Sequence, residues 1–278
     1  MQIIYPSEGE LKQIFLMPLQ NFDPLDLPAL YGTIYIIKIH SKQNIIKINQ
    51  QEESAEKEKM SNVKVIEIKK SVFENNDAEA EKLRRRLKEK GVFLLNLMSS
   101  PGSGKTSVLA RTIRELHDEM AIGIMEADID SAVDAETIAA TGVKTIQIHT
   151  GGMCHLDAGM TEKGLLELGT EDIDLVVLEN VGNLVCPAEF DTGASKNAMI
   201  LSVPEGDDKP LKYPLMFSTV DLLLINKIDC LTYFDFDMNA VYERVRKINP
   251  GIEIIEVSAK TGEGFDKWTD WLRENIKV

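Results

Sequence analysis

Several common sequence features are missing from this chain, and each absence excludes or disfavours a class of protein. No run of about eighteen apolar residues is present, so the sequence predicts no membrane-spanning segment. The N-terminus lacks a basic stretch followed by an apolar one, which favours a cytoplasmic location over export. Basic residues are in deficit, with 31 Lys and Arg against 45 Asp and Glu, and a net charge of −14 argues against general nucleic-acid binding. Three cysteines are too few, and odd in number, for a disulfide framework, so they favour a reducing compartment.

The length of 278 residues fits one large domain or a domain with an appendage. Residues 41–59 are rich in Lys, Gln, Asn and Glu, which is typical of a solvated or disordered segment. We therefore predict an N-terminal extension over 1–60, a strand and helix segment over 61–90 and the main domain over 91–278. Two hypotheses stay open for the extension: Met60 is the true start, or the extension is genuine and poorly structured. Mass spectrometry of the native N-terminus separates them.

From Gly91 onward, apolar strand patterns alternate with helical patterns. Strands are predicted at 92–98, 121–126, 143–148, 173–178, 198–203, 220–226 and 252–257. Helices are predicted at 77–90, capped by Asp77, and at 104–120, 132–141, 156–168, 237–248 and 264–276. This alternation predicts an α/β fold with a mostly parallel sheet covered by helices on both faces. Ligands of such folds bind beyond the carboxyl ends of the strands, where every motif described next is placed.

The stretch Ser-Ser-Pro-Gly-Ser-Gly-Lys-Thr over 99–106, between a predicted strand and a predicted helix, indicates a phosphate-binding loop. Its glycines let backbone N–H groups face phosphate oxygens, and the following helix directs its positive end at the same anion. The motif usually starts with Gly, whereas this chain has Ser99. A Gly-rich turn without a ligand is the alternative. The predicted nucleotide-binding residues of this loop are Pro101, Gly102, Ser103, Gly104, Lys105, Thr106 and Ser107.

A second motif, Asn226-Lys227-Ile228-Asp229, follows a predicted strand and indicates a site that reads guanine. The Asp229 carboxylate can accept both donors on one edge of guanine, and adenine would leave it poorly paired. Asn226 can tie this loop to the phosphate loop, and the Lys227 stem can lie along the base. A later strand is followed by Ser258, Ala259 and Lys260, whose backbone can donate to the guanine oxygen. A turn with a helix cap is the alternative interpretation.

Acidic residues at two strand ends are candidates for magnesium and catalysis. Asp128 could hold Mg²⁺ or position the attacking water, and Glu179 could contact Mg²⁺ through water. We predict Lys105, Asp128 and Glu179 as catalytic residues and Thr106, Asp128 and Glu179 as the magnesium site. Asp134 could cap a helix or belong to a switch, and Asp130 has no assigned role.

Cys154 and His155 are adjacent, and Cys186 follows Glu179 by seven positions. Two thiolates and one imidazole suit Zn²⁺ or Ni²⁺, with one coordination position left open for transfer. Taken alone, however, this pattern favours buried structural residues. Cys230 is expected in the core, and His149 is a candidate secondary ligand.

Residues 61–278 resemble the HypB family of hydrogenase nickel-incorporation GTPases. The matching segments are 99–106, Cys-His-Leu-Asp-Ala (154–158), Glu-Asn-Val-Gly-Asn-Leu-Val-Cys-Pro-Ala (179–188), Phe-Asp-Thr-Gly (190–193), 205–214 and 226–229. The resemblance implies a P-loop GTPase of the SIMIBI type that binds GTP, GDP and Mg²⁺. It also implies that Cys154, His155 and Cys186 form a metal site at the interface of a homodimer. The family's N-terminal Cys-x-x-Cys-Gly-Cys motif and its histidine-rich tract are absent.

The expected function is therefore slow GTP hydrolysis coupled to nickel delivery for [NiFe]-hydrogenase maturation. Expected partners are a second copy on binding GTP and metal, a nickel-delivery accessory protein and a hydrogenase large subunit. Three alternatives stay open: a UreG-like urease nickel GTPase, an ATP-using kinase or transporter-type ATPase, and a GTPase scaffold with structural zinc. Binding of GTP against ATP tests the second alternative, and reversible metal removal tests the third. A UreG-like protein would be expected to carry a Cys-Pro-His motif, whereas this chain has Cys-His and Cys-Pro in separate places.

Overall fold

The computed structural model describes residues 68–128, 138 and 141–276 of the chain. Within these residues a seven-stranded sheet has the order β3-β2-β4-β1-β5-β6-β7, with every neighbouring pair parallel. The strands are β1 (Phe93–Ser99), β2 (Ile122–Asp128), β3 (Lys144–His149), β4 (Leu175–Glu179), β5 (Lys196–Ser202), β6 (Leu222–Asn226) and β7 (Glu253–Glu256). The predicted fold class and all seven predicted strands are confirmed, with no boundary shifted by more than two residues.

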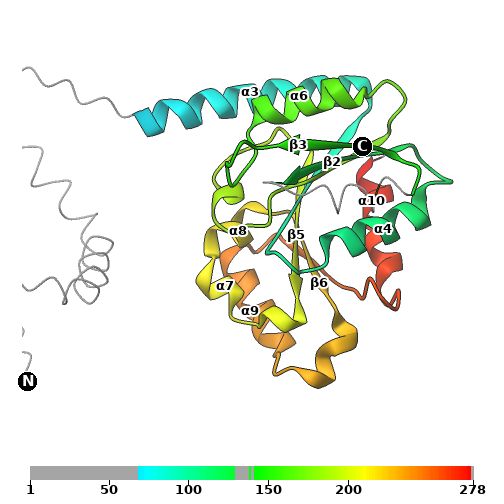
Figure 1. Cartoon of the computed structure of the whole chain (residues 1–278). Helices are drawn as coiled ribbons and strands as arrows, with labels where there is room; N and C mark the ends of the chain where they lie inside the picture. The colour runs from blue at the N-terminus through cyan, green and yellow to red at the C-terminus, as the bar shows by residue number, and fades with distance from the viewer. Residues whose placement is uncertain (1–67, 129–137, 139–140, 277–278) are drawn as a thin grey trace, which may run out of the picture. The chain divides into compact units, whose positions relative to one another are not determined.

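Helices cover both faces of this sheet (Figure 1). They are α3 (Ile68–Lys90), α4 (Lys105–Leu116), α6 (Ala158–Leu168), α7 (Lys209–Lys212), α8 (Pro214–Thr219), α9 (Met238–Ile248) and α10 (Phe265–Ile276). Side chains alternate across β1: Leu95 and Leu97 pack with α4 and α10, whereas Leu94 packs with α3 and α6 on the opposite face. Residues of β5 and β6 bury their side of that second face against α8 and α9. The near-continuous apolar strands are thus explained by burial on two faces.

The predicted helix over 77–90 begins nine residues earlier, at Ile68, so Asp77 is no helix cap. The polar run Asn75-Asn76-Asp77 is typical of a helix start, but here it lies inside the helix. Its central member is buried, at 7% exposure, and its side chain bonds to other segments. Tertiary hydrogen bonds therefore override the local signal.

The helices predicted over 104–120, 156–168, 237–248 and 264–276 correspond to α4, α6, α9 and α10. Asp157 caps α6 by accepting from Met160 N, as its position after Cys154-His155-Leu156 allows. The helix predicted over 132–141, Asp130, Asp134 and the extension over 1–60 lie outside the described residues. The short helices α7 and α8 and three 3₁₀ segments, η3 (Cys186–Ala188), η4 (Val203–Glu205) and η5 (Ile228–Tyr233), were not predicted.

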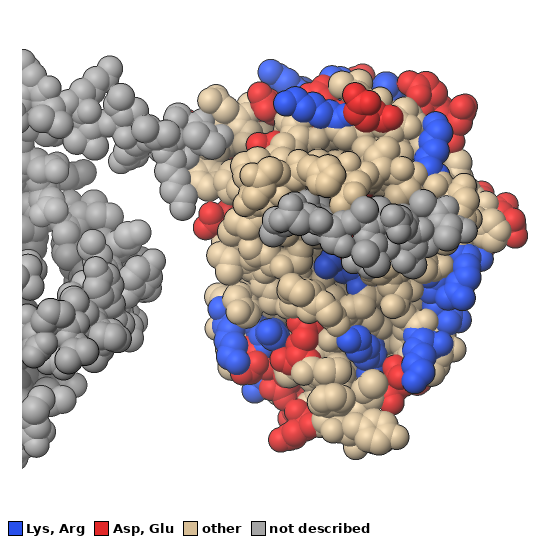
Figure 2. Space-filling model, in the orientation of Figure 1, with Lys and Arg blue, Asp and Glu red and all other residues tan. Residues whose placement is uncertain are grey.

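Charged side chains of both signs lie intermixed over α3 and α6 (Figure 2). Several are paired, as in Arg84 with Glu81 and Arg86 with Glu162. The charge run of α3 is thus a solvated helix face. Across the part of the chain that the structure describes, no helix has the length and apolar character needed to cross a bilayer.

Candidate functional site

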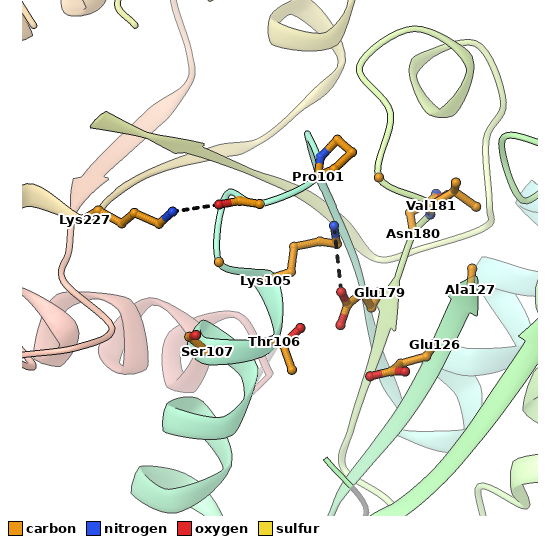
Figure 3. A pocket seen from close by; sticks show the side chains of 13 residues that line it. Pro101, Lys105, Thr106, Ser107, Glu126, Ala127, Glu179, Asn180, Val181 and Lys227 are labelled. Carbon is orange, nitrogen blue, oxygen red and sulfur yellow. Dashed lines mark hydrogen bonds and ion pairs between the residues drawn. The ribbon is translucent and has the colours of Figure 1, made fainter. Parts of the chain in front are cut away.

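A cavity of about 730 Å³ opens at the carboxyl ends of β1, β2 and β4. Its floor is the predicted phosphate loop, and the first residues of α4 point into it from one side (Figure 3). Lining residues predicted from the sequence are Pro101, Gly102, Gly104, Lys105, Thr106, Ser107, Glu179 and Lys227. Parallel strands place their carboxyl ends at one edge, which is why residues far apart in the chain meet here.

Ser99 organises the phosphate loop. Its hydroxyl donates to Ser100 O at 2.8 Å and accepts from Ser103 Oγ at 2.7 Å and from Lys105 Nζ at 3.0 Å. The ammonium of Lys105 also lies 3.8 Å from Glu179 Oε1. The departure from Gly at this position therefore supplies a partner that holds Lys105 at the cavity. Ser103 is fully buried beneath the loop rather than exposed to the cavity.

The guanine motif is tied to the phosphate loop by two hydrogen bonds. Asn226 Nδ2 donates to Ser103 O at 3.0 Å, which is the link expected from the sequence, and Lys227 Nζ donates to Gly102 O at 2.7 Å (Figure 3). Gly104 adopts φ 98°, and a Cβ there would lie only 2.7 Å from Asn226 Nδ2. Glycine is required at this position both by the backbone angle and by the close approach of the amide.

A second cavity, of about 190 Å³, shares Gly104, Ser107 and Lys227 with the first and extends to the base-reading residues. Asn226, Asp229, Ala259 and Lys260 line it, together with Cys230. Cys230 is half-buried and packs against the core cluster, as expected for a core residue. It also lines this cavity, which was not predicted. The two joined cavities have the form that a nucleotide needs: phosphates at one end and a base at the other.

Hydrogen bonds orient the Asp229 carboxylate. Ser258 Oγ donates to Asp229 Oδ1 at 2.6 Å, and this bond holds the pKa of Asp229 below its usual value. The Ala259 N–H, one of the three backbone groups predicted as donors to the guanine oxygen, donates to Asn226 Oδ1 at 3.2 Å. The same residue's carbonyl accepts from Arg111 Nη1 of α4 at 3.3 Å. The loop predicted to read the base is therefore anchored to both β6 and α4.

The predicted magnesium ligands Thr106 and Glu179 line the larger cavity. Glu126, for which no role was predicted from the sequence, lies beside them (Figure 3). Its side chain is buried and lines the cavity, and Glu126 is in register with Glu179 on the neighbouring strand. A hydroxyl and two carboxylates are oxygen donors that suit Mg²⁺. Asp128 ends β2, but its side chain lies outside the description. Glu126 could have been predicted from its spacing: it is acidic and lies two positions before Asp128, the strand end, so the two positions share one face of the strand.

The structure brings Cys154, His155 and Cys186 together from two separate loops. The thiols of Cys154 and Cys186 are neighbours, and their interaction raises the pKa of Cys154. His155 Nδ1 lies 3.9 Å from Cys154 Sγ, and burial lowers the pKa of His155, which favours the neutral imidazole. The imidazole stacks on Phe190 with ring centroids 3.8 Å apart and an interplanar angle of 11°.

These three side chains are neighbours without forming a closed coordination set. Among residues 68–128, 138 and 141–276, no group of three or more His, Cys, Asp or Glu side chains is placed to hold a metal. The chemistry of the donors, two thiols and a neutral imidazole, still suits a borderline cation such as Ni²⁺ or Zn²⁺. His149, at the exposed end of β3, is not drawn into this group.

Comparisons with known proteins show the family to which this chain belongs. A family model described as "CobW/HypB/UreG, nucleotide-binding domain" matches residues 93–256 and defines the class of P-loop nucleotide-binding protein. The hydrogenase maturation factor HypB of Rhizobium leguminosarum bv. viciae is 46% identical over 213 residues, covering 77% of this chain and 71% of that protein. The hydrogenase/urease maturation factor HypB of Helicobacter hepaticus is 40% identical over 217 residues, covering 77% of this chain and 89% of that protein.

A crystal structure of HypB from Helicobacter pylori in complex with nickel matches with a TM-score of 0.69 and 39% identity, covering 73% of this chain and 95% of that one. The chain therefore belongs to the HypB family of hydrogenase maturation factors.

Proposed function

We propose that this protein binds and hydrolyses GTP and uses the nucleotide to control a nickel ion held by Cys154, His155 and Cys186 during hydrogenase maturation. The observation that carries the proposal is a single short segment. Residues Asn180, Val181 and Gly182 line the phosphate cavity, and Cys186 follows only four positions later. A change in how this segment meets the phosphates therefore reaches the thiol.

Guanine selectivity is supported by the fixed Asp229 carboxylate. The Ser258 hydroxyl leaves Asp229 ionised and oriented, so a base that offers two adjacent donors is favoured over adenine. Lys105 is placed for the β- and γ-phosphates, and Thr106 with Glu179 would hold Mg²⁺, which neutralises the charge that develops on the phosphates. These roles follow from positions in the cavity.

Coupling between the sites is supported by the packing of the segment after β4 on the phosphate loop. A Cβ at Gly182 would lie 3.2 Å from Pro101 Cγ, so the segment and the loop are in close contact. If the γ-phosphate and Mg²⁺ reorder this contact, Cys186 moves relative to Cys154 and His155. Metal affinity then depends on the nucleotide, and by linkage nucleotide affinity depends on the metal to the same factor.

Three side-chain donors leave a coordination position for a transfer partner or for a second copy of the chain. Because the described residues contain no closed set of metal ligands, a homodimer that joins two such groups would complete the site. We expect GTP and metal together to favour this dimer and hydrolysis to release it. A nickel-delivery accessory protein and a hydrogenase large subunit are the corresponding partners.

The test is titration of Ni²⁺ and Zn²⁺ into the protein bound to a non-hydrolysable GTP analogue or to GDP, with light scattering to follow the dimer. We expect metal affinities to differ between the two nucleotides by about fivefold or more. Lys105→Ala serves as the control, since it should lose this difference along with nucleotide binding. Identical affinities with both nucleotides would refute the coupling, and preference for ATP would refute the guanine assignment.

Urease maturation is a second candidate, favoured by the similarity to the Helicobacter hepaticus protein, a hydrogenase/urease maturation factor. The two candidates share the nucleotide and metal chemistry and differ in the enzyme served. Restoring hydrogenase or urease activity in a strain lacking its own HypB separates them.

A further inference from the structure

The two thiols of the metal group belong to segments with no direct sequence connection. Cys154 lies in the loop between β3 and α6, and Cys186 lies in the connection between β4 and β5. The closeness of the two thiols therefore depends on how these two segments are held against each other. The question is which residue holds them.

Asn76 of α3 contacts both segments with one side chain. Its Oδ1 accepts from Ala158 N at 2.9 Å, at the first residue of α6 and four positions after Cys154. Its Nδ2 donates to Asp191 O at 2.9 Å, five positions after Cys186. The amide is buried, so neither partner exchanges easily with water, and loss of either bond leaves a buried group unpaired.

Other residues of the same helix face keep Asn76 in place. Phe73, one turn earlier, lies 4.9 Å from the ring of Phe190, which in turn stacks on His155. Arg84 donates to both carboxylate oxygens of Asp191 at 2.8 Å and to Ala194 O at 2.8 Å. Figure 1 shows α3 beside α6 over the edge of the sheet that carries β2 and β3.

We propose that Asn76 is a positioning residue of the metal group and sets the separation of Cys154 and Cys186. Helix α3 precedes residues 93–256, the part that matches the family model, so the geometry of the thiols is controlled from a helix outside the matched residues. The inference deepens the proposed function, on which it rests only for the identity of the ion.

The test measures thiol proximity in metal-free protein. Diamide converts two neighbouring thiols to a disulfide: two S–H bonds break, one S–S bond forms, and two electrons and two protons reduce the diazene to a hydrazine. Peptide mapping follows the Cys154–Cys186 disulfide with time. We expect Asn76→Ala to slow its formation roughly three- to tenfold, because both bonds of the amide are lost.

Two further variants make the result specific. Asn76→Asp keeps an acceptor for Ala158 N but cannot donate to Asp191 O, so an intermediate rate is expected. Asn75→Ala, an exposed neighbour on the same helix, should match the unchanged protein. GDP affinity, measured in each variant, should stay constant because the nucleotide cavities are built on strand ends away from α3.

Unchanged disulfide rates in Asn76→Ala with intact GDP binding would overturn the inference. If Asn76→Ala fails to fold, an Asn76→Asp rate equal to that of the unchanged protein would overturn it instead. A Ni²⁺ titration of the same proteins separates the two proposals: slowed disulfide formation in the Asn76 variants, with no nickel bound even by the unchanged protein, would sustain the role of Asn76 and refute the proposed function.

Discussion

The nucleotide cavities and the thiol group are built in different ways. The cavities lie on strand ends, and their key groups are joined by buried hydrogen bonds, such as Asn226 Nδ2 to Ser103 O. The thiols of Cys154 and Cys186 lie on loops, half-buried, with each other and an imidazole as their polar neighbours. The first arrangement is fixed by the sheet, whereas the second is fixed by contacts between loops and by α3.

This contrast fits two different chemical tasks. Selective recognition of a base requires groups that cannot shift toward a competitor, because specificity comes from leaving a fixed group unpaired. Capture and release of a metal requires ligands whose separation can change by a small amount. We expect substitutions in the cavities to change nucleotide affinity without changing thiol proximity, and substitutions around the loops to do the reverse.

The largest expected effect is on the base-reading carboxylate. Asp229→Asn replaces one acceptor by a donor, so GDP affinity should fall by about 100-fold or more, since one hydrogen bond becomes a clash between two donors and the other loses its charge assistance. Xanthosine diphosphate, which carries a carbonyl in place of the amino group, should bind the variant better than GDP. Fluorescence titration measures both, and an unchanged preference for GDP would contradict the assignment of Asp229.

The next effect concerns the metal ligands. Cys186→Ser removes a direct ligand, whereas loss of an outer-shell partner typically weakens metal binding by about 10- to 100-fold. We therefore expect Ni²⁺ affinity to fall by more than that, while GDP affinity in metal-free protein stays unchanged. Cys230→Ser is the matched control, because Cys230 lines the base cavity and should leave metal affinity as it was. Equal losses of Ni²⁺ affinity in both variants would contradict the assignment of Cys186 as a specific metal ligand. Isothermal titration calorimetry provides the measurement.

A smaller effect is expected at Arg111, which joins α4 to the base-reading loop. Its guanidinium donates to Ala259 O and lies 5.2 Å from the centroid of Phe265. Arg111→Met should weaken GDP binding roughly three- to fivefold without changing pyrophosphate binding, since one hydrogen bond is lost on the base side only. Arg114→Met on the same helix is the control, because Arg114 is exposed and donates to its own helix. Equal behaviour of the two variants would remove Arg111 from the site.

The smallest effect concerns the pKa of Asp229. The hydrogen bond from Ser258 lowers this pKa, so the carboxylate stays charged to lower pH. The contribution of the charged carboxylate to GDP affinity and to stability is therefore lost only as the pH falls through the lowered pKa. Ser258→Ala removes the donor, so the pKa should rise and the loss should begin at a higher pH. Carbon NMR of the Asp229 carboxyl measures the shift. A pKa that stays low in Ser258→Ala would assign the cause to another neighbour.

Much of the nucleotide site was predictable because its residues are close in sequence within each motif. The motifs over 99–106 and 226–229 each predict a loop after a strand. Parallel strands bring such loops together at one edge of the sheet, however the core is packed. The register of β2 with β4, which places Glu126 beside Glu179, was not predictable in the same way. It depends on which strands become neighbours, and no local pattern records that.

The sequence by itself determined the class of fold and the phosphate and base motifs, because these follow from hydrophobic periodicity and short spacings. The three candidate metal ligands came from the resemblance to a family, since their pattern alone favoured structural residues. Only the tertiary structure decided the start of α3 and the role of Asn76. That residue bonds to partners 82 and 115 positions away, and a helix-interior amide resembles a helix cap until those partners are in place. Long-range packing chose between the two interpretations, since a buried amide is stable only where both of its polar atoms are paired.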